Sequence, residues 1–231
     1  MALSQKYNRT YHYPFSLGAS SDDRIHLNYW EDIQQITQII HTEKLDGENN
    51  CLSKYGVFAR SHASPTVSPW TQSLRQRWEL IKHDLGDLEI FGENLYAIHS
   101  IEYQNLEDTF FIFAIRYLDC WLSWDEVQCY ATLLDFPTVP VIKQGLVKDY
   151  TAIALEKEII SLSQTSSVFG SIEHNTGTPC SKEGIVTRNS QEFLTSNFKQ
   201  NVFKFVRKGH VTTDEHWTKN WKKAHVAIHG K

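Results

Sequence analysis

Lys44 is the residue of this sequence that is best placed to act as a nucleophile. It lies two residues before Asp46-Gly47, a dipeptide typical of tight turns, so a strand that ends at Lys44 could present the amine to a pocket. A lysine amine attacks only after losing its proton, which requires a pKa lowered from about 10.4 by burial or by nearby positive charge. A bound metal ion could supply that charge. Taken alone, Lys-x-Asp-Gly is a weak signal, because a lysine beside such a turn is usually solvated.

Four further segments follow Lys44 and combine charged residues with small or apolar ones. They are Phe58-Ala59-Arg60-Ser61, Phe91-Gly92-Glu93-Asn94-Leu95-Tyr96, Lys182-Glu183-Gly184-Ile185-Val186 and Phe203-Lys204-Phe205-Val206-Arg207-Lys208, with the run Phe110-Phe111-Ile112-Phe113 between the second and the third. Several spaced motifs in a fixed order are more specific than any one of them. Together they resemble the covalent nucleotidyltransferases, the superfamily of polynucleotide ligases and mRNA capping enzymes, over roughly residues 42–208.

Within that superfamily, two features are most similar to the ATP-dependent RNA ligases. Glu43 directly precedes Lys44, and the second segment contains Gly-Glu-Asn. The lead-in Arg9-Thr10-Tyr11-His12 and the tail Gly209–Trp217 also resemble small bacterial and phage RNA ligases. The resemblance implies an α+β nucleotidyltransferase (adenylation) domain of antiparallel sheets with flanking helices.

The resemblance also implies a reaction of three in-line displacements. Lys44 would attack the α-phosphate of ATP to give lysyl-AMP, the AMP would pass to an RNA 5′-phosphate, and a 3′-OH would then displace AMP. Each step develops charge on phosphate oxygens, so Mg²⁺ (or Mn²⁺) and Lys204 would be needed as cations. Glu183 would face the metal and Lys44. The expected partners are RNA ends, in a nicked duplex or a single strand, with an end-healing enzyme as a further candidate.

Four residues are assigned to the nucleotide by the same resemblance. Glu43 would read the adenine amino edge, Phe113 would stack on the adenine, and Glu93 would bind ribose hydroxyls. Arg60 would contact a phosphate of the nucleotide or of the RNA end, because a guanidinium fork fits phosphate oxygens. The run Phe-Phe-Ile-Phe is also the pattern of a buried strand, with Phe111 and Phe113 on one face.

Candidate RNA contacts come from one amide and from the basic C-terminus. Residues 199–231 carry a net charge of +6, against −10 for the remainder. Such a patch suits a phosphate-binding surface, although a solvated charged tail has the same composition. Trp217 and Trp221 could stack on bases, but two Trp four residues apart more often mark the buried face of a short helix, so we favour packing for the rings. The expected RNA-binding residues are Asn49, Arg207, Lys208, Lys219, Lys222 and Lys223.

Two departures from the family pattern stand out. Related ligases commonly carry two lysines separated by one residue in the last motif, whereas here Val206 follows Lys204, which leaves Arg207 and Lys208 as candidates for the second cation. Only 23 residues follow Lys208, too few for the C-terminal oligonucleotide-binding barrel of DNA ligases and capping enzymes. We therefore expect a nucleotidyltransferase domain over 1–210, a basic extension over 211–231, and no such barrel.

The composition agrees with a folded chain of one α+β domain. Of 231 residues, 41% are hydrophobic and only 6 are Pro, which excludes a disordered protein. There is no apolar run of 18 residues and the start is too polar for a signal peptide, so we expect a cytoplasmic protein without a membrane segment. The four cysteines form no C-x-x-C pair, which favours reduced thiols over a zinc site.

Local patterns predict the elements that must position these residues. Helices are expected over 30–35, over 70–85 from apolar positions spaced by three and four, after a capping box at Ser123-x-x-Glu126, and over 151–162. Strands are expected over 36–43, 57–60, 88–96, 110–117, 185–187 and 202–206. Val57–Arg60 is predicted to be the hairpin partner of the strand over 36–43, and residues 1–24 to be an irregular lead-in.

Two other functions remain open from the sequence. One is a minimal DNA ligase or a ligase for mixed RNA and DNA strands, since the motifs do not specify the sugar. The other is a nucleic-acid-binding relative without turnover, against which the intact Lys44, Glu93, Glu183 and Lys204 argue.

Overall fold

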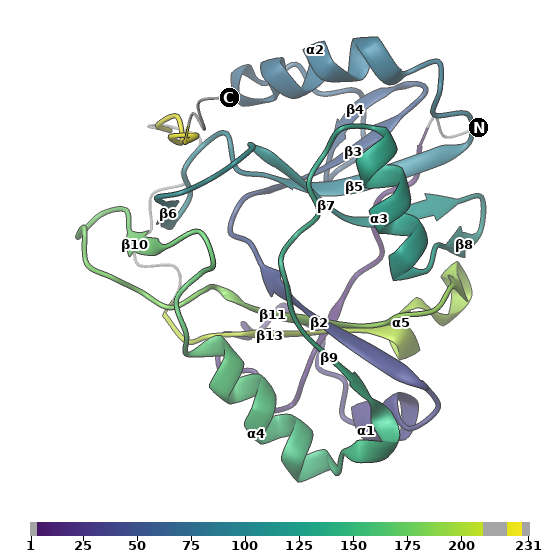
Figure 1. Cartoon of the computed structure of the whole chain (residues 1–231), viewed down its shortest axis with the longest axis vertical. Coiled ribbons are helices and arrows are strands. Elements are labelled where there is room, and N and C mark those ends of the chain that lie inside the picture. Colours follow the sequence, from purple (N-terminus) through teal and green to yellow (C-terminus); the bar gives the residue numbers. More distant parts are fainter. Residues whose placement is uncertain (1–3, 210–220, 228–231) are drawn as a thin grey trace.

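Two large β-sheets, mainly antiparallel, form the centre of the molecule in a computed structural model that describes residues 4–209 and 221–227. Figure 1 shows the two sheets one above the other. The five-stranded sheet has the order β1 (Tyr11–His12), β13 (Val202–Val206), β11 (Gly184–Asn189), β2 (Gln38–Lys44) and β9 (Val141–Leu146). The six-stranded sheet has the order β12 (Phe193–Leu194), β8 (Cys120–Trp121), β7 (Phe110–Tyr117), β5 (Leu88–Asn94), β3 (Glu48–Ser53) and β4 (Gly56–Ala59). β6 (Ile101–Tyr103) and β10 (Ser171–Glu173) pair separately.

Helices cover the outer face of each sheet, which produces three apolar layers. Figure 1 places α1 (Tyr29–Ile33) and α4 (Ala152–Ser163) beyond the five-stranded sheet, and α2 (Gln72–Ile81) beyond the six-stranded one. Leu155 and Ile159 of α4 pack with Ile39 and Ile185, while Leu74 of α2 belongs to the cluster on the other side of the molecule. The helices are α1 (Tyr29–Ile33), α2 (Gln72–Ile81), α3 (Trp124–Leu133), α4 (Ala152–Ser163) and α5 (Phe198–Asn201), with 3-10 turns at Pro69–Thr71, Val147–Asp149 and Thr195–Asn197.

The third layer lies between the two sheets and is largely aromatic. Phe91 and Trp121 of the six-stranded sheet meet Phe198, which begins the short helix before β13, and Val202, the first residue of β13. Because this inner layer joins the two sheets, it fixes the spacing of the side chains that point between them.

The capping box is confirmed. The Ser123 hydroxyl accepts the amide hydrogen of Glu126, and the Glu126 carboxylate accepts that of Ser123, so α3 begins at Trp124. The helix expected over 70–85 is shorter, because Pro69–Thr71 forms a 3-10 turn and α2 itself ends at Ile81.

The predicted hairpin is wrong. β4 pairs with β3, a strand that the sequence patterns did not indicate, with Cys51 opposite Phe58. β2 instead pairs with β11 and β9 in the other sheet. At Asp46-Gly47 the chain therefore passes from the five-stranded sheet to the six-stranded one. A side chain at Gly47 would clash there, since a Cβ would lie 2.5 Å from the carbonyl oxygen of Asn94.

The C-terminal residues 221–227 are extended and pack on the body of the fold. Ile98 N donates to Lys222 O and Ala224 N donates to Tyr96 O, both at 2.9 Å. Trp221 contacts the rings of Trp70 and Tyr96, so the packing role expected for this ring is confirmed. Trp217 and Lys219 lie outside the described residues, as do the predicted domain boundary at 210/211 and most of the Gly209–Trp217 tail.

No helix within 4–209 or 221–227 combines the length and apolar character that a bilayer crossing requires.

Candidate active site

A cavity of about 530 Å³ opens between the two sheets, and Lys44 lies in its wall. Most of the residues predicted for nucleotide chemistry line it together with Asn49, a predicted RNA contact, although they come from distant parts of the sequence. These residues are Glu43, Lys44, Asn49, Arg60, Glu93, Phe113 and Lys204. Glu183 reaches the site through its contact with Lys44.

The Lys44 amine is held by both oxygens of one carboxylate. Its Nζ donates to Glu183 Oε1 at 2.7 Å and to Oε2 at 2.6 Å. The pairing follows from strand register, because Lys44 ends β2 directly opposite Gly184 of β11. Only glycine fits at 184, since a Cβ would lie 1.9 Å from the carbonyl oxygen of Phe205. The close approach of β11 to β13 therefore fixes the backbone beside Glu183.

Acidic groups keep Lys44 in its ammonium form. Burial alone would lower the pKa of Lys44, but the nearby carboxylates of Glu183 and Glu93 outweigh burial and raise it. Burial, with repulsion from Glu183 and Asp46, also raises the pKa of Glu93 to about 8, although Lys44 opposes that shift. The carboxyl groups of Glu183, Glu93 and Asp46 are thus crowded around Lys44, and a cation bound on this side of the cavity would relieve their mutual repulsion.

Glu43 is almost completely buried, and one of its carboxylate oxygens lacks a hydrogen-bond partner among the described residues. Its Oε2 accepts the amide hydrogen of Val168 at 3.3 Å, whereas Oε1 has no hydrogen-bond partner among the described residues. Burial raises the pKa of this carboxyl group. A buried acceptor without a donor is costly, so Oε1 fits an N–H group brought by a bound molecule.

Phe113 reaches the cavity through a β-bulge. In the β5–β7 ladder Gly92 pairs with Ile112 and Phe91 with Ala114, so Phe113 is left between them. Its carbonyl accepts from Arg188 Nη1 at 3.1 Å, and its ring meets Tyr7 edge-on at 5.1 Å. Bulges of this kind redirect a side chain, and here the half-buried ring lines the cavity.

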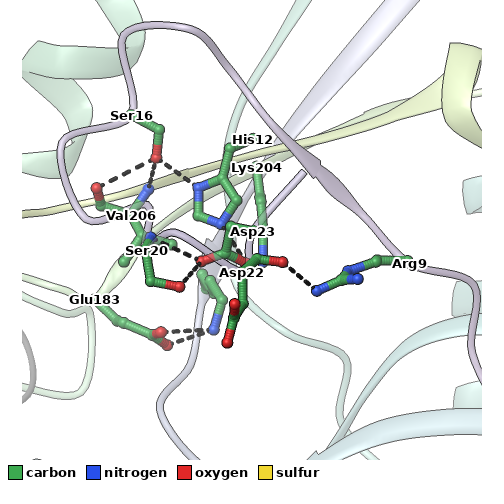
Figure 2. Close-up of polar contacts among 10 residues, drawn as sticks. Arg9, His12, Ser16, Ser20, Asp22, Asp23, Glu183, Lys204 and Val206 are labelled. Carbon is green, nitrogen blue, oxygen red and sulfur yellow. Dashed lines mark hydrogen bonds and ion pairs between the residues drawn. The ribbon is translucent and has the colours of Figure 1, made fainter. Parts of the chain in front are cut away.

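Lys204 lies in β13 and lines the same cavity as Lys44. Its Nζ is 3.5 Å from Asp23 Oδ1 (Figure 2). Burial, and after it the charge of Lys44, lowers the pKa of Lys204. Two ammonium groups therefore face one cavity, an arrangement that favours a polyanionic ligand such as a triphosphate.

The other predicted cations are arranged differently. Arg60 is exposed at the edge of the cavity. Arg207 and Lys208 follow β13 and do not line the cavity, although Arg207 N donates to Glu183 O. Lys222 and Lys223 are exposed on the C-terminal segment, where Lys223 Nζ lies 5.2 Å from the Tyr96 ring centre.

Sequence reasoning missed the part of the site that the N-terminus supplies. Tyr7, Asn8 and Thr10 line the cavity, and Tyr7 packs on the aromatic layer between the sheets. A signal was present, since a segment without periodicity that carries so many aromatic residues must pack on something larger. Arg188, an arginine next to the β-branched run 185–187, was also missed.

Comparison with known proteins agrees with this geometry. The sequence model of the RNA ligase family matches residues 37–206, most of the chain. The chain belongs to the RNA ligase family. A search of curated protein sequences finds no match.

Solved structures share the fold of this RNA ligase family member at low identity. An archaeal ATP-dependent RNA ligase superposes with a TM-score of 0.52 and 14% identity, covering 88% of this chain and 48% of that one. A Naegleria gruberi RNA ligase mutant with ATP and Mn superposes with a TM-score of 0.53 and 18% identity, and the match covers 86% of this chain and 58% of that one. A putative ATP-dependent DNA ligase from Aquifex aeolicus superposes with a TM-score of 0.50 and 15% identity, and the match covers 87% of this chain and 50% of that one. This chain thus spans about half to three fifths of these proteins.

The predicted α+β nucleotidyltransferase fold with antiparallel sheets and flanking helices is confirmed by these superpositions and by the two sheets.

Proposed function

We propose that this chain is an ATP-dependent RNA ligase that joins RNA 3′-OH and 5′-phosphate ends through lysyl-AMP and RNA-adenylate intermediates. The observation that carries the proposal is the Lys44 amine on both oxygens of Glu183, in a cavity that Lys204 and Glu93 also line. The nucleophile, the cations and the carboxylates that the reaction needs are thus within one site.

The proposed chemistry balances in three steps. Lys44 Nζ, after losing a proton, forms a bond to the α-phosphorus of ATP while the bond to the leaving pyrophosphate breaks. A 5′-phosphate oxygen of the RNA then takes the AMP and restores the lysine. Finally a 3′-OH attacks the activated 5′-phosphorus, which forms the phosphodiester and releases AMP. In each step Lys204 is placed to stabilise charge on phosphate oxygens.

The adenine nucleotide fits three groups of the cavity. Glu43 Oε1 is the buried acceptor that an adenine N6–H would satisfy, and the Phe113 ring offers a stacking surface. Glu93, whose pKa near 8 lets it both donate and accept at neutral pH, suits ribose hydroxyls.

A divalent cation fits the acidic side of the same cavity. Mg²⁺ in phosphate-transfer sites is usually held by one or two carboxylates together with substrate phosphates. The described residues contain no ready group of three protein ligands, so Glu183 with the phosphates is the proposed donor set for Mg²⁺ or Mn²⁺. When bound, the metal would stabilise charge on the phosphate oxygens and help Lys44 to lose its proton.

One experiment tests both the nucleotide and the polynucleotide. With α-³²P-labelled ATP and Mg²⁺, we expect label on the denatured protein through an acid-labile bond. Labelled GTP should react roughly 5- to 150-fold less, because a mismatched hydrogen bond in a closed pocket costs about 1–3 kcal/mol. Equal labelling by both nucleotides would contradict the adenine assignment to Glu43 and Phe113.

The second arm uses nicked duplexes that differ only in RNA or DNA on either side of the nick. We expect sealing when RNA supplies the 3′-OH. Sealing of the all-DNA nick at an equal rate would instead favour the alternative, a minimal DNA or mixed-strand ligase, with which the superposition on a putative DNA ligase is compatible. Absence of both labelling and sealing would favour a non-catalytic nucleic-acid-binding relative.

RNA phosphates are proposed to contact the basic residues outside the cavity. Lys222 and Lys223 are exposed, and the segment that carries them is anchored by backbone hydrogen bonds to residues 96–106. Arg207 and Lys208, and Lys219 outside the described residues, are proposed to contact RNA phosphates as well. Asn49, whose buried Oδ1 has no hydrogen-bond partner among the described residues, is proposed to lie near the reacting RNA ends.

Replacing Lys219, Lys222 and Lys223 by alanine should weaken sealing while leaving lysine labelling nearly intact. Each lost phosphate contact should flatten the dependence of log affinity on log salt by roughly one unit or less. The matched control replaces Lys148 and Lys157, which are exposed near and on α4. Unchanged sealing and salt slope in the triple variant would refute these contacts, whereas Trp221→Ala should lower Tm.

The remaining partner proposals follow from the reaction. A ligase that needs 5′-phosphate and 3′-OH ends would work with an end-healing enzyme wherever breaks carry other ends. Its use of ATP and RNA ends supports the cytoplasm as its location.

A further inference from the structure

Asp23 connects the N-terminal segment to Lys204. Figure 2 shows its carboxylate between the His12 ring and the lysine amine. Asp23 Oδ1 lies 3.1 Å from His12 Nε2 and 3.5 Å from Lys204 Nζ. None of the functions assigned above uses this carboxylate, and it precedes the 37–206 region that matches the family.

The Asp23 carboxylate is itself rigidly held. Its Oδ2 accepts from both the backbone N and the hydroxyl of Ser20, each at 3.0 Å. The turn is closed by a further hydrogen bond from Asp23 N to Ser20 O. A carboxylate fixed at one oxygen presents the other in a defined direction, so the position of Lys204 is constrained as well.

The same network returns to the strand that carries Lys204. His12 is buried, and its Nδ1 lies 2.8 Å from Ser16 Oγ, which accepts the amide hydrogen of Val206 at 2.9 Å. Val206 and Lys204 are two residues apart in β13 and share a face. Although Ser16, His12 and Asp23 are the types of a hydrolytic triad, the serine is 7% exposed and bonded to the backbone, so its role is structural.

The cavity thus contains two lysines, each with its own carboxylate. Glu183 holds Lys44 and Asp23 holds Lys204. The charged or titratable groups that face Lys204 are Asp23, Lys44, Glu183 and the neutral His12, whose pKa burial and Lys204 lower to about 4. Without Asp23, the only carboxylate among these groups would be Glu183, and Lys204 would compete with Lys44 for it.

We propose that Asp23 is a positioning residue for Lys204, which it keeps apart from the Lys44–Glu183 pair and directed at the phosphates of the bound nucleotide. An ammonium group has three donors, so Lys204 can keep Asp23 and still donate to phosphate oxygens. The inference rests on the proposed adenylylation reaction. It assigns to residues before 37 a part in the chemistry of the site.

The test measures single-turnover labelling by ATP in Asp23→Asn, which removes the charge with little change of shape. We expect a maximal rate about tenfold lower, with the half-saturating ATP concentration changed by less than about twofold, because the loss affects orientation rather than binding. Asp23→Glu should fall between wild type and Asp23→Asn. Asp22→Asn, which removes the same charge from the exposed neighbour, should label as wild type.

A double-mutant cycle with Lys204→Ala tests whether Asp23 affects the labelling rate through Lys204. If Asp23 acts through Lys204, Asp23→Asn should cause no further loss in the Lys204→Ala background. An equal loss in both backgrounds would overturn the inference. Wild-type labelling by Asp23→Asn would overturn it too, and if that variant does not fold, wild-type labelling by Asp23→Glu would do so.

A readout that needs no ligase activity separates this inference from the proposed function. Acetylation of Lys204 by acetic anhydride, measured by mass spectrometry against the exposed Lys148, should rise about threefold in Asp23→Asn, since the carboxylate stabilises the unreactive ammonium. If wild type takes no label from ATP, the proposed function fails, and this readout still tests the contact. Unchanged Lys204 reactivity would overturn the inference by itself.

Discussion

Lys44→Ala is expected to abolish labelling by α-³²P ATP, by at least about a thousandfold at saturating nucleotide. No other lysine of the described chain is held on a cavity carboxylate in the same way: Lys204 lies 3.5 Å from its partner, whereas Lys44 donates to both Glu183 oxygens at 2.6–2.7 Å. The assay is retention of label on denatured protein, with release by acid. Full labelling of Lys44→Ala would show that another residue is the nucleophile.

Two controls separate chemistry from charge. Lys44→Arg keeps the positive charge beside Glu183, but a guanidinium does not lose its proton, so this variant should also remain unlabelled. Lys54→Ala removes an exposed lysine that pairs with Asp87, and it should label normally. Labelling of Lys44→Arg at the wild-type rate would mean that the charge at this position is sufficient.

Glu183→Gln should reduce lysine labelling by about 10²- to 10³-fold at saturating Mg²⁺. The change acts in two opposite directions. It removes the carboxylate that raises the pKa of Lys44, which by itself would increase the fraction of neutral amine at a given pH. It also removes the negative charge that is proposed to face the metal, and we expect this loss to dominate. The pH dependence of labelling should therefore move to lower pH even as the maximal rate falls.

The control for Glu183→Gln is Glu107→Gln, which removes an exposed carboxylate outside the cavity and should leave the rate unchanged. The measurement is single-turnover labelling at increasing Mg²⁺ and at several pH values. A Glu183→Gln enzyme with the wild-type rate and metal dependence would refute the proposed role of this carboxylate.

Strands with strong local patterns were predictable, but their partners were not. Residues 110–117 and 202–206 have the bounds expected from their apolar and aromatic content. β3 escaped prediction because Glu48–Ser53 contains two asparagines and a glutamate, residues that are depleted in strands, and its pairing with β4 and β5 overrides that local preference. The two-residue strand β12 exists only through its pairing with β8, which lies about 70 residues away in the sequence.

In the site, too, the motif residues were predictable from the sequence, whereas a contact that depends on strand pairing was not. The order of motifs brought together seven residues that do line one cavity, because each motif sits at a strand end or within a strand that borders the space between the sheets. Asp23 could not be predicted, since its contact with Lys204 depends on β1 pairing in parallel with β13, which places His12 opposite Lys204. Nothing in the spacing of two residues 181 positions apart indicates that register.

The three residues Leu45–Gly47 that separate β2 from β3 make Lys44 the last residue of one sheet, while Asn49 and Glu93 belong to the other. Lys44 and Glu183 are therefore joined by the hydrogen bonds of neighbouring strands, and a rigid displacement of one sheet against the other would carry both together. The spacing of Lys44 from Glu93 or Phe113 depends instead on the side-chain packing between the two sheets, and not on hydrogen bonds of neighbouring strands. A displacement of one sheet against the other would therefore change the contacts of a bound nucleotide with Glu93 and Phe113, while the Lys44–Glu183 pair stayed intact. A nucleotide could then enter or leave the cavity without separating the nucleophile from its carboxylate.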